Sequence, residues 1–339
     1  MMRWVCTSNR GFANLAMEEL RRLFPGVSFQ QLAAGEVFAA DIPLERDEML
    51  AAIAEKEPIF LRHIQPVDRA LPVAGNADDL SVLSDTIRYV GYAFDEKRTA
   101  VHVRRAEATR FPYSVSDTKA VLDAVLTEIG GEPAMQEPEV ILTVYAAAEE
   151  LLVGWGSPQE LLSDWPGGAV RFQREEGQIS RAKFKLLEAE RTFGLRLSDF
   201  REALDVGAAP GGWTSLLLER GLAVTAVDPA ELHPSLKGYP KLTYLNKNAG
   251  DVRFGRGSFD LLVCDMSWSP MLMVKLVMEL RQALKPGATA IITVKLMHRK
   301  PLQTIRDVVD KLEGAFELRK AKQLFHNRDE ITLYLTKRT

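Results

Sequence analysis

Residues 203–214 have the sequence ALDVGAAPGGWT. The first four, Ala203–Val206, have the apolar composition of the end of a buried strand, and a glycine-rich bend follows over Gly207–Gly212. Trp213 then opens an apolar helix that stops at Gly221. A strand, a glycine bend and a helix in this order predict the ligand-binding corner of a doubly wound α/β sheet.

The spacing within the bend limits the class of ligand. The dinucleotide pattern GxGxxG needs a glycine at the second position after Gly207, where Ala209 stands, and the P-loop signature GK[ST] is absent. Asp228 ends the next expected strand, LAVTAVD, where it can accept both ribose hydroxyls of an adenosine. A bend built for an adenosine without a diphosphate indicates S-adenosylmethionine (SAM). The alternative is a structural glycine turn in another kind of α/β domain.

The composition is that of a soluble globular protein. The chain has 339 residues, of which 46% are apolar and 26% charged, so two or three domains are expected. It has no apolar run of the ~20 residues that cross a membrane, and its N-terminus lacks the apolar core of a signal peptide. Cys6 and Cys264 lie far apart, which argues against a zinc site or a disulfide framework. We therefore expect a cytoplasmic protein with no metal and no membrane partner.

The order of expected elements divides the chain into three parts. Residues 1–66 follow the order strand, helix, strand, strand, helix, strand, which is ferredoxin-like. A polar, proline-bearing connector over Pro66–Ala77 leads to a second α/β unit over residues 77–160. After the linker Trp165–Gly168, the βα alternation around the glycine bend ends in an antiparallel pair of strands. Residues 165–339 are therefore expected to form a Rossmann-like domain, of the variant found in SAM-dependent methyltransferases.

The second unit contains a candidate RNA-binding surface. The net charge of −3 gives no global sign of a nucleic-acid partner, so any contact must come from a local basic patch. One such group contains Arg104, Arg105, Arg110, Tyr113 and Lys119. The arginines and the lysine can hold phosphates, and the tyrosine offers a stacking face. The alternative is an ordinary solvated surface.

Four ionisable residues are expected at the active-site edge of the C-terminal sheet. Asp265 ends the strand LLVCD, Lys295 ends the strand IITVK, and Glu330 begins the last strand. Lys185 lies on a helix expected over Gln178–Arg191, before the glycine bend. Each residue alone has a simple structural explanation, such as a solvated strand end. Their convergence on one cleft indicates catalysis.

These motifs resemble those of the FtsJ-type (RrmJ-like) RNA ribose 2′-O-methyltransferases, which use a Lys-Asp-Lys-Glu tetrad. The segment SRAKFKL supplies Lys185, DVGAAPGGW supplies the SAM bend, and Asp265 precedes a methionine as in that family. Lys295 in TVKL and Glu330 in RDEITLYL complete the match, which covers about half the chain. The resemblance implies that cofactor contacts come from the tetrad aspartate together with Ser180, Gly207, Ala209, Pro210, Gly211, Gly212, Trp213, Asp228 and Asn248.

The N-terminal half, with a ferredoxin-like unit and a THUMP-like α/β unit, extends the resemblance to the RlmM family. That resemblance implies methylation of a cytidine ribose in large-subunit ribosomal RNA. The sequence gives no direct account of the oligomeric state, for which a monomer is favoured. One departure is Asn248, because the family usually has an aspartate at this adenine-contacting position. An amide oxygen can still accept a hydrogen bond from the adenine amino group.

The chemistry requires a base for the ribose hydroxyl. We expect Lys295 to serve, because burial and the neighbouring Lys185 ammonium both lower a lysine pKa, whereas Glu330 opposes them. Asp265 would orient the Lys295 ammonium near the SAM methyl group.

Two alternative functions remain at this point. One is a THUMP-containing base N-methyltransferase acting on transfer RNA, although the loop DMSWSP lacks the NPPY-like pattern that such enzymes need. The other is a non-catalytic RNA-binding protein that keeps the SAM fold.

Overall fold

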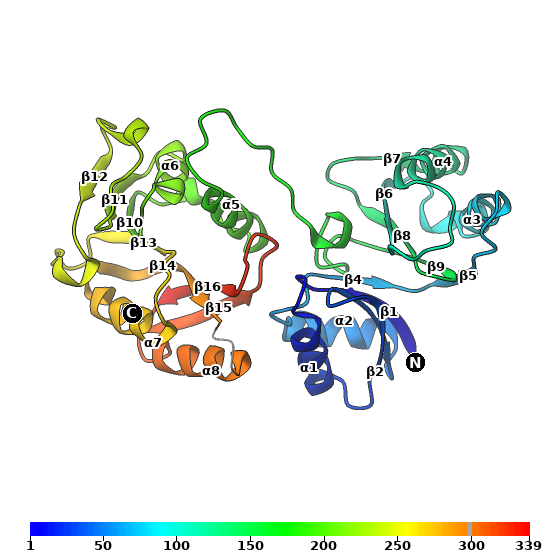
Figure 1. Ribbon diagram of the computed structural model, residues 1–339, viewed down its shortest axis with the longest axis horizontal. Coiled ribbons are helices and arrows are strands. Elements are labelled where there is room, and N and C mark those ends of the chain that lie inside the picture. The colour runs from blue at the N-terminus through cyan, green and yellow to red at the C-terminus, as the bar shows by residue number, and fades with distance from the viewer. Residues whose placement is uncertain (297–299) are drawn as a thin grey trace. The chain divides into compact units, whose positions relative to one another are not determined.

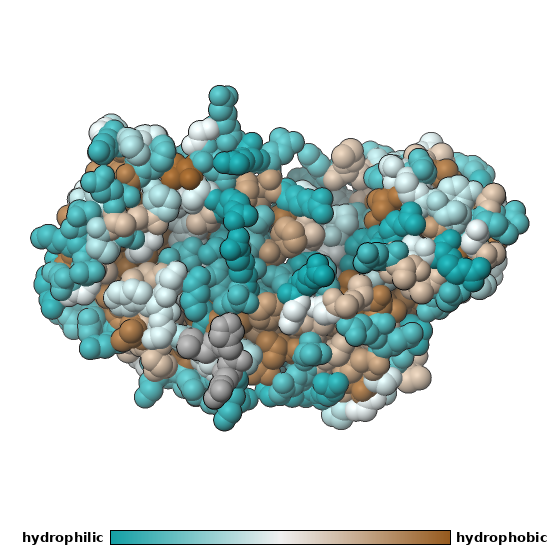
Figure 2. All heavy atoms as spheres, in the orientation of Figure 1, coloured by the Kyte–Doolittle hydropathy of each residue, from teal (hydrophilic) through white to brown (hydrophobic). Residues whose placement is uncertain are grey.

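The structure, a computed structural model, describes residues 1–296 and 300–339. The chain divides into two compact units, Met1–Ala169 and Val170–Thr339, each with its own sheets and apolar core (Figure 1). Hydrophilic side chains cover most of the face seen in Figure 2, with apolar ones scattered among them. No helix within the described ranges is both long and apolar enough to cross a membrane.

The first unit begins with a four-stranded sheet in the order β2-β3-β1-β4, in which β1 runs antiparallel to both β3 and β4. Two helices connect its strands, so the chain order is βαββαβ, as expected for residues 1–66. This combination of chain order and sheet order is ferredoxin-like. Its elements are β1 (Met2–Thr7), α1 (Ala13–Leu23), β2 (Ser28–Ala33), β3 (Val37–Ile42), α2 (Arg46–Glu55) and β4 (His63–Pro66).

A five-stranded sheet in the order β5-β9-β8-β6-β7 completes the first unit. The expected connector contributes its edge strand, because Arg69–Pro72 pairs antiparallel with β9. The two sheets share an interior, where the buried Gln65 side chain donates to the Leu152 carbonyl at 2.8 Å. The elements are β5 (Arg69–Pro72), α3 (Asp78–Tyr89), η1 (Gly91–Ala93), β6 (Arg98–Arg105), α4 (Val115–Glu128), β7 (Glu132–Pro133), β8 (Val140–Ala146), β9 (Glu150–Gly156) and η2 (Pro166–Gly168).

The second unit is built on a seven-stranded sheet in the order β12-β11-β10-β13-β14-β16-β15, of which only β16 runs antiparallel to both of its neighbours. This is the Rossmann-like arrangement with a terminal hairpin that the sequence predicts. Its elements are α5 (Ala182–Thr192), η3 (Leu197–Asp199), β10 (Glu202–Val206), α6 (Gly212–Glu219), β11 (Ala223–Val227), η4 (Pro234–Leu236), β12 (Leu242–Leu245), η5 (Ala249–Asp251), β13 (Phe259–Cys264), α7 (Pro270–Leu280), η6 (Arg281–Ala283), β14 (Leu284–Lys295), α8 (Pro301–Leu312), β15 (Phe316–Lys322) and β16 (Glu330–Lys337).

The sheet places the ends of its central strands at one edge. Cys264, the last residue of β13, is in register with Val206 at the end of β10 and with Ile292 on β14. From β10 the chain continues through β11 to β12 at one edge of the sheet, whereas from β13 it continues through β14 toward the other edge. The chain order therefore reverses between the neighbouring strands β10 and β13. In open parallel sheets, ligands bind at the carboxyl ends of the strands at such a reversal.

Helices α5 and α6 cover one face of this sheet through a common apolar cluster. Leu186 and Ala189 of α5 and Leu216 and Leu217 of α6 are completely buried there. Complete burial of a leucine side chain contributes roughly 1.5–3 kcal/mol. Helix α5 begins at Ala182, four residues later than the sequence predicts. The Ser180 side chain accepts the Ala182 backbone N–H at 3.2 Å, and the preceding residues are not helical.

Candidate active site

The glycine bend after β10 has a backbone that other residues would strain. Gly207 and Gly211 have φ values of +75° and +113°. A Cβ on Gly207 would lie 2.5 Å from Cγ of Met266, and one on Gly212 would lie 2.3 Å from Oγ of Ser180. Glycine is therefore required both for conformation and for close approach. The bend, including Ala209 and Pro210, leaves bare backbone at the carboxyl edge of the sheet.

Asp228 and Trp213 fix the two sides of the bend. The Asp228 carboxylate follows β11 and accepts the backbone N–H groups of Ala209 at 3.0 Å and Ala230 at 2.7 Å. A carboxylate has about four acceptor sites, so it retains capacity for ribose hydroxyls. On the other side, the buried Trp213 donates its indole N–H to the Ala182 carbonyl at 2.7 Å, which ties α6 to the start of α5.

Asn248 lies in the loop after β12, at the start of η5. Its side-chain amide donates to Asp251 at 3.4 Å, and the residue is exposed. The role of Asn248 as an acceptor for the adenine amino group stays a prediction.

The four expected catalytic residues come together. Lys185 Nζ lies 2.9 Å from Oδ2 of Asp265 and 2.6 Å from Oε1 of Glu330. Lys295 forms an ion pair with the other oxygen of Glu330, and the two residues are paired across β14 and β16. Glu330 therefore bridges both lysines, and its side chain is only 2% exposed. The Lys295 side chain is 30% exposed, so it is the more accessible of the two lysines.

The ion pairs determine the charge states of this cluster. Burial lowers the pKa of Lys185, but Asp265 and Glu330 raise it by more, so it lies above the ordinary value of 10.5. Burial raises the pKa of Glu330, but Lys185 and Lys295 lower it by more, so it lies below 4.5. At neutral pH, Lys185 is therefore an ammonium and Glu330 a carboxylate.

Three further residues support the cluster, and none of them was predicted from the sequence. Thr293 donates its hydroxyl to Oδ1 of Asp265 at 2.8 Å. Asn327 donates its amide to Oε1 of Glu330 at 3.4 Å. Glu188 accepts two backbone N–H groups in the turn that leads to Glu330, those of Phe325 at 2.7 Å and His326 at 2.9 Å.

Two of these three supporting residues had a signal in the sequence. Thr293 stands two positions before Lys295 on one strand, so the two side chains point to the same face. Glu188 stands three positions after Lys185, on the same side of a helix.

A buried carboxyl group lies beneath the bend. Asp205 is 1% exposed and accepts the Thr214 hydroxyl at 2.6 Å. Burial raises the pKa of Asp205 to about 7, against the lowering effect of that hydrogen bond. Asp205 therefore titrates in the neutral range although it lies under the site and not in it.

The basic residues of the first unit are engaged in contacts within that unit. Arg105 donates to the Phe111 carbonyl at 2.9 Å, Arg110 pairs with Glu149 at 2.9 Å, and Lys119 pairs with Asp123 at 2.5 Å. The Tyr113 hydroxyl donates to the Ala77 carbonyl at 2.9 Å. These surface contacts can exchange for phosphate, and an RNA-binding role for these four residues stays a prediction.

Arg104 requires a correction. Its guanidinium points into the first unit, where it donates to the Thr7 hydroxyl at 2.8 Å and lies 5.2 Å from the ring centre of Tyr145. Burial lowers the pKa of Arg104 to about 10. Strand alternation predicts that Arg104 and Arg105 face opposite sides of the sheet. The face of β6 that bears Arg104 packs against the first sheet. Arg104 is therefore not a surface contact for phosphate.

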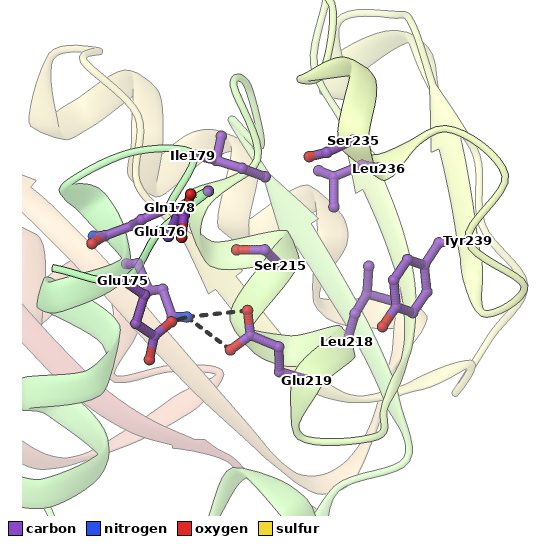
Figure 3. A pocket seen from close by; sticks show the side chains of 12 residues that line it. Glu175, Glu176, Gln178, Ile179, Ser215, Leu218, Glu219, Ser235, Leu236 and Tyr239 are labelled. Carbon is purple, nitrogen blue, oxygen red and sulfur yellow. Dashed lines mark hydrogen bonds and ion pairs between the residues drawn. The ribbon is translucent and has the colours of Figure 1, made fainter.

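A pocket of about 190 Å³ opens beside α6 (Figure 3). Its walls include Ser215, Glu219 and Tyr239. Lys183 is held in it by ion pairs to Glu175 at 2.7 Å and Glu219 at 2.8 Å. None of the four tetrad residues lines this pocket. Within residues 1–296 and 300–339, no group of three or more histidine, cysteine, aspartate or glutamate residues is arranged to hold a metal ion.

The fold and the site together define the second unit as a Rossmann-like methyltransferase domain. Residues 178–323 match the family model of the FtsJ-like methyltransferases, a SAM-dependent class, so this unit contains an FtsJ-like methyltransferase domain. The match covers the glycine bend and three of the four tetrad residues, and Glu330 lies just beyond it.

Comparisons with curated proteins give similar relatives. The "Ribosomal RNA large subunit methyltransferase M" of Halorhodospira halophila (strain DSM 244 / SL1) is 38% identical over 174 residues, which cover 50% of each chain. The protein of the same name from Laribacter hongkongensis (strain HLHK9) is 33% identical over 198 residues, 54% of this chain and 53% of that protein. The chain thus spans about half the length of the curated relatives it matches.

Among solved structures, TrmN from Thermus thermophilus is 18% identical and covers 100% of each chain with a TM-score of 0.42. A similarity of this size does not bear on function.

Proposed function

We propose that this protein methylates the 2′-hydroxyl of a ribose, that of a cytidine in large-subunit ribosomal RNA, with SAM as the methyl donor. The observation that carries the proposal is the Lys185–Asp265–Lys295–Glu330 cluster at the carboxyl edge of the sheet, beside the glycine bend. The identity of the RNA rests on the names of the curated relatives.

The residues around the bend fit SAM. The positive φ values of Gly207 and Gly211 let the chain turn sharply at the carboxyl edge of the sheet, and the Asp228 carboxylate after β11 can accept the ribose hydroxyls of the adenosine. Asn248 supplies an acceptor for the adenine amino group. When bound, SAM supplies a methyl group on a sulfonium, which becomes a neutral thioether as the methyl is transferred.

The tetrad provides a group that can accept the proton of the ribose hydroxyl. A hydroxyl is a weak nucleophile, so its proton must leave as the new O–C bond forms. Lys185 is unsuited to accept that proton, because its pKa is raised by two carboxylates. Lys295 contacts one of these carboxylates and is more exposed, so we assign it as the base, which accepts the hydroxyl proton as its neutral amine. Lys185 and Glu330 then orient the hydroxyl, and Asp265 holds Lys185 in place.

Analysis of the methylated nucleoside tests the proposal. The full chain would be incubated with labelled SAM and an unmodified transcript of large-subunit ribosomal RNA, which is then digested to nucleosides. The label is expected in 2′-O-methylcytidine. Label in a base-methylated nucleoside, or no transfer under conditions where SAM binds, would refute the proposal. Lys311→Ala is a matched control, because Lys311 is an exposed lysine of the same unit outside the tetrad.

A further inference from the structure

Exposed apolar side chains gather directly after Asp265. Trp268 is 38% exposed, Met271 46% and Leu272 55%. In the described part of the second unit, the other large apolar side chains with such exposure are Tyr239 and Leu318, far away in sequence. Large apolar surfaces left in contact with water mark binding sites when they gather in one place. We refer to these three side chains as the 268–272 patch.

The segment that bears this patch is anchored at both ends. At its start, the Met266 side chain packs against the bare backbone of Gly207, where a Cβ would lie 2.5 Å from Cγ of Met266. At its end, Pro270 is buried and begins α7, and Met273 is buried one turn later. The patch therefore projects from a fixed loop at the carboxyl edge of the sheet, next to the site.

The charge around the patch suits a polyanion. The stretch Met266–Val274 contains no charged residue, and the first one after it is Lys275. Three residues before Trp268, the Asp265 carboxylate is already paired with Lys185 at 2.9 Å. Because the neighbouring Asp265 carboxylate is paired, it repels a phosphate backbone that approaches this apolar surface less than a free carboxylate would.

We propose that the 268–272 patch binds the base of the nucleotide whose ribose is methylated, with Trp268 stacked on the face of that base. This inference rests on the proposed methyl transfer to RNA. When a ribose reaches the tetrad, the base of the same nucleotide must lie close to the site. Single-stranded bases are held on aromatic side chains because every base has a π-face. Met271 and Leu272 extend the apolar surface at the edge of the stacked base.

Substitutions at Trp268 in the full chain test the proposal. Trp268→Ala is expected to raise the KM for the ribosomal RNA transcript about 5- to 150-fold, the measured range for loss of one base–aromatic stack. The affinity for SAM is expected to stay within about twofold. Trp268→Phe is expected to restore most of the loss because it keeps an aromatic face, and Trp268→Leu is not. Tyr239→Ala is the matched control, because Tyr239 is 45% exposed in the same unit and lines the pocket beside α6.

Two results would overturn the proposal while the wild-type chain methylates RNA. One is an unchanged KM in Trp268→Ala. The other is equal rescue by leucine and phenylalanine, which would identify the patch as a contact for an apolar protein surface. A binding measurement separates this proposal from the proposed function. Oligocytidine is expected to quench tryptophan fluorescence of the wild-type chain, and Trp268→Phe is expected to lose that quenching even if no methyl transfer occurs. Equal quenching in both would refute stacking.

Discussion

The Glu188→Gln substitution probes the contact that holds the Glu330 turn on the helix bearing Lys185. Glu188 is 2% exposed, and its two carboxylate oxygens accept the backbone N–H groups of Phe325 at 2.7 Å and His326 at 2.9 Å. A glutamine of nearly the same shape can accept only one of them. The other N–H would then face an amide NH₂ group and lose its partner.

The expected minimum effect is that of one lost hydrogen bond to a backbone N–H. A buried donor left without a partner costs about 1–3 kcal/mol. For a unit of this length, each kcal/mol lowers Tm by about 2–4 °C, so the expected loss is about 2–12 °C. Because Glu330 follows this turn by four residues, kcat is expected to fall about 10- to 100-fold through misplacement of the carboxylate. The affinity for SAM is expected to remain unchanged.

Calorimetric unfolding of the full chain, amide exchange at Phe325 and His326, and steady-state methylation measure these effects. Glu279→Gln is the control, because Glu279 is an exposed glutamate on α7. An unchanged Tm and unchanged amide exchange in Glu188→Gln would refute the role of Glu188 in holding this turn. A lowered Tm with an unchanged kcat would show that the Glu188 contacts stabilise the unit without positioning Glu330.

Three further predictions concern the bend, the buried acid and the basic surface. Gly207→Ala is expected to weaken SAM binding at least tenfold in calorimetry, because its Cβ would lie 2.5 Å from the Met266 side chain at a φ of +75°; unchanged affinity would show that the bend adapts. The pKa of Asp205 is about 7 against 3.8 for the ordinary group, so the folded state binds more protons between these values and its stability falls as pH rises from about 4 to 7, by up to about 4 kcal/mol. Asp205→Asn is expected to remove this decline in denaturant titrations, and an identical pH profile would refute it. The triple substitution of Arg105, Arg110 and Lys119 by alanine is expected to weaken RNA binding and to flatten its log–log salt dependence by about 0.7–0.9 per lost phosphate contact; an unchanged salt slope would identify an ordinary surface.

The sequence was sufficient to predict the Rossmann-like domain and the convergence of Lys185, Asp265, Lys295 and Glu330. Parallel strands bring their carboxyl ends to one edge, so Asp265 and Lys295 had to lie near the glycine bend once their strands were recognised. The match of the SRAKFKL segment added Lys185, and the terminal hairpin added Glu330. Each of these predictions depends on local patterns and on a topology with few alternatives.

The features that the sequence did not predict depend on packing between distant segments. The face of β6 that packs against the first sheet determines that the Arg104 guanidinium points inward and that Arg105 is exposed, and strand alternation predicts only that the two side chains face opposite sides. The sharing of Glu330 by both lysines requires the β14–β16 register. The connector after Pro66 became strand β5 because β9 offers an unpaired edge to it.

The role of Lys295 is the central claim, and the Lys295→Arg variant tests it most directly. A guanidinium keeps its proton at any accessible pH, so the variant preserves the charge and loses the base. We predict that SAM affinity changes by less than about tenfold and that the methylation rate falls about 10²- to 10⁴-fold, the usual contribution of a positioned general base. Lys295→Ala is expected to be similarly inactive. A Lys295→Arg variant that methylates ribosomal RNA at close to the wild-type rate would contradict the account, because Lys295 would then act only as an electrostatic contact for the ribose.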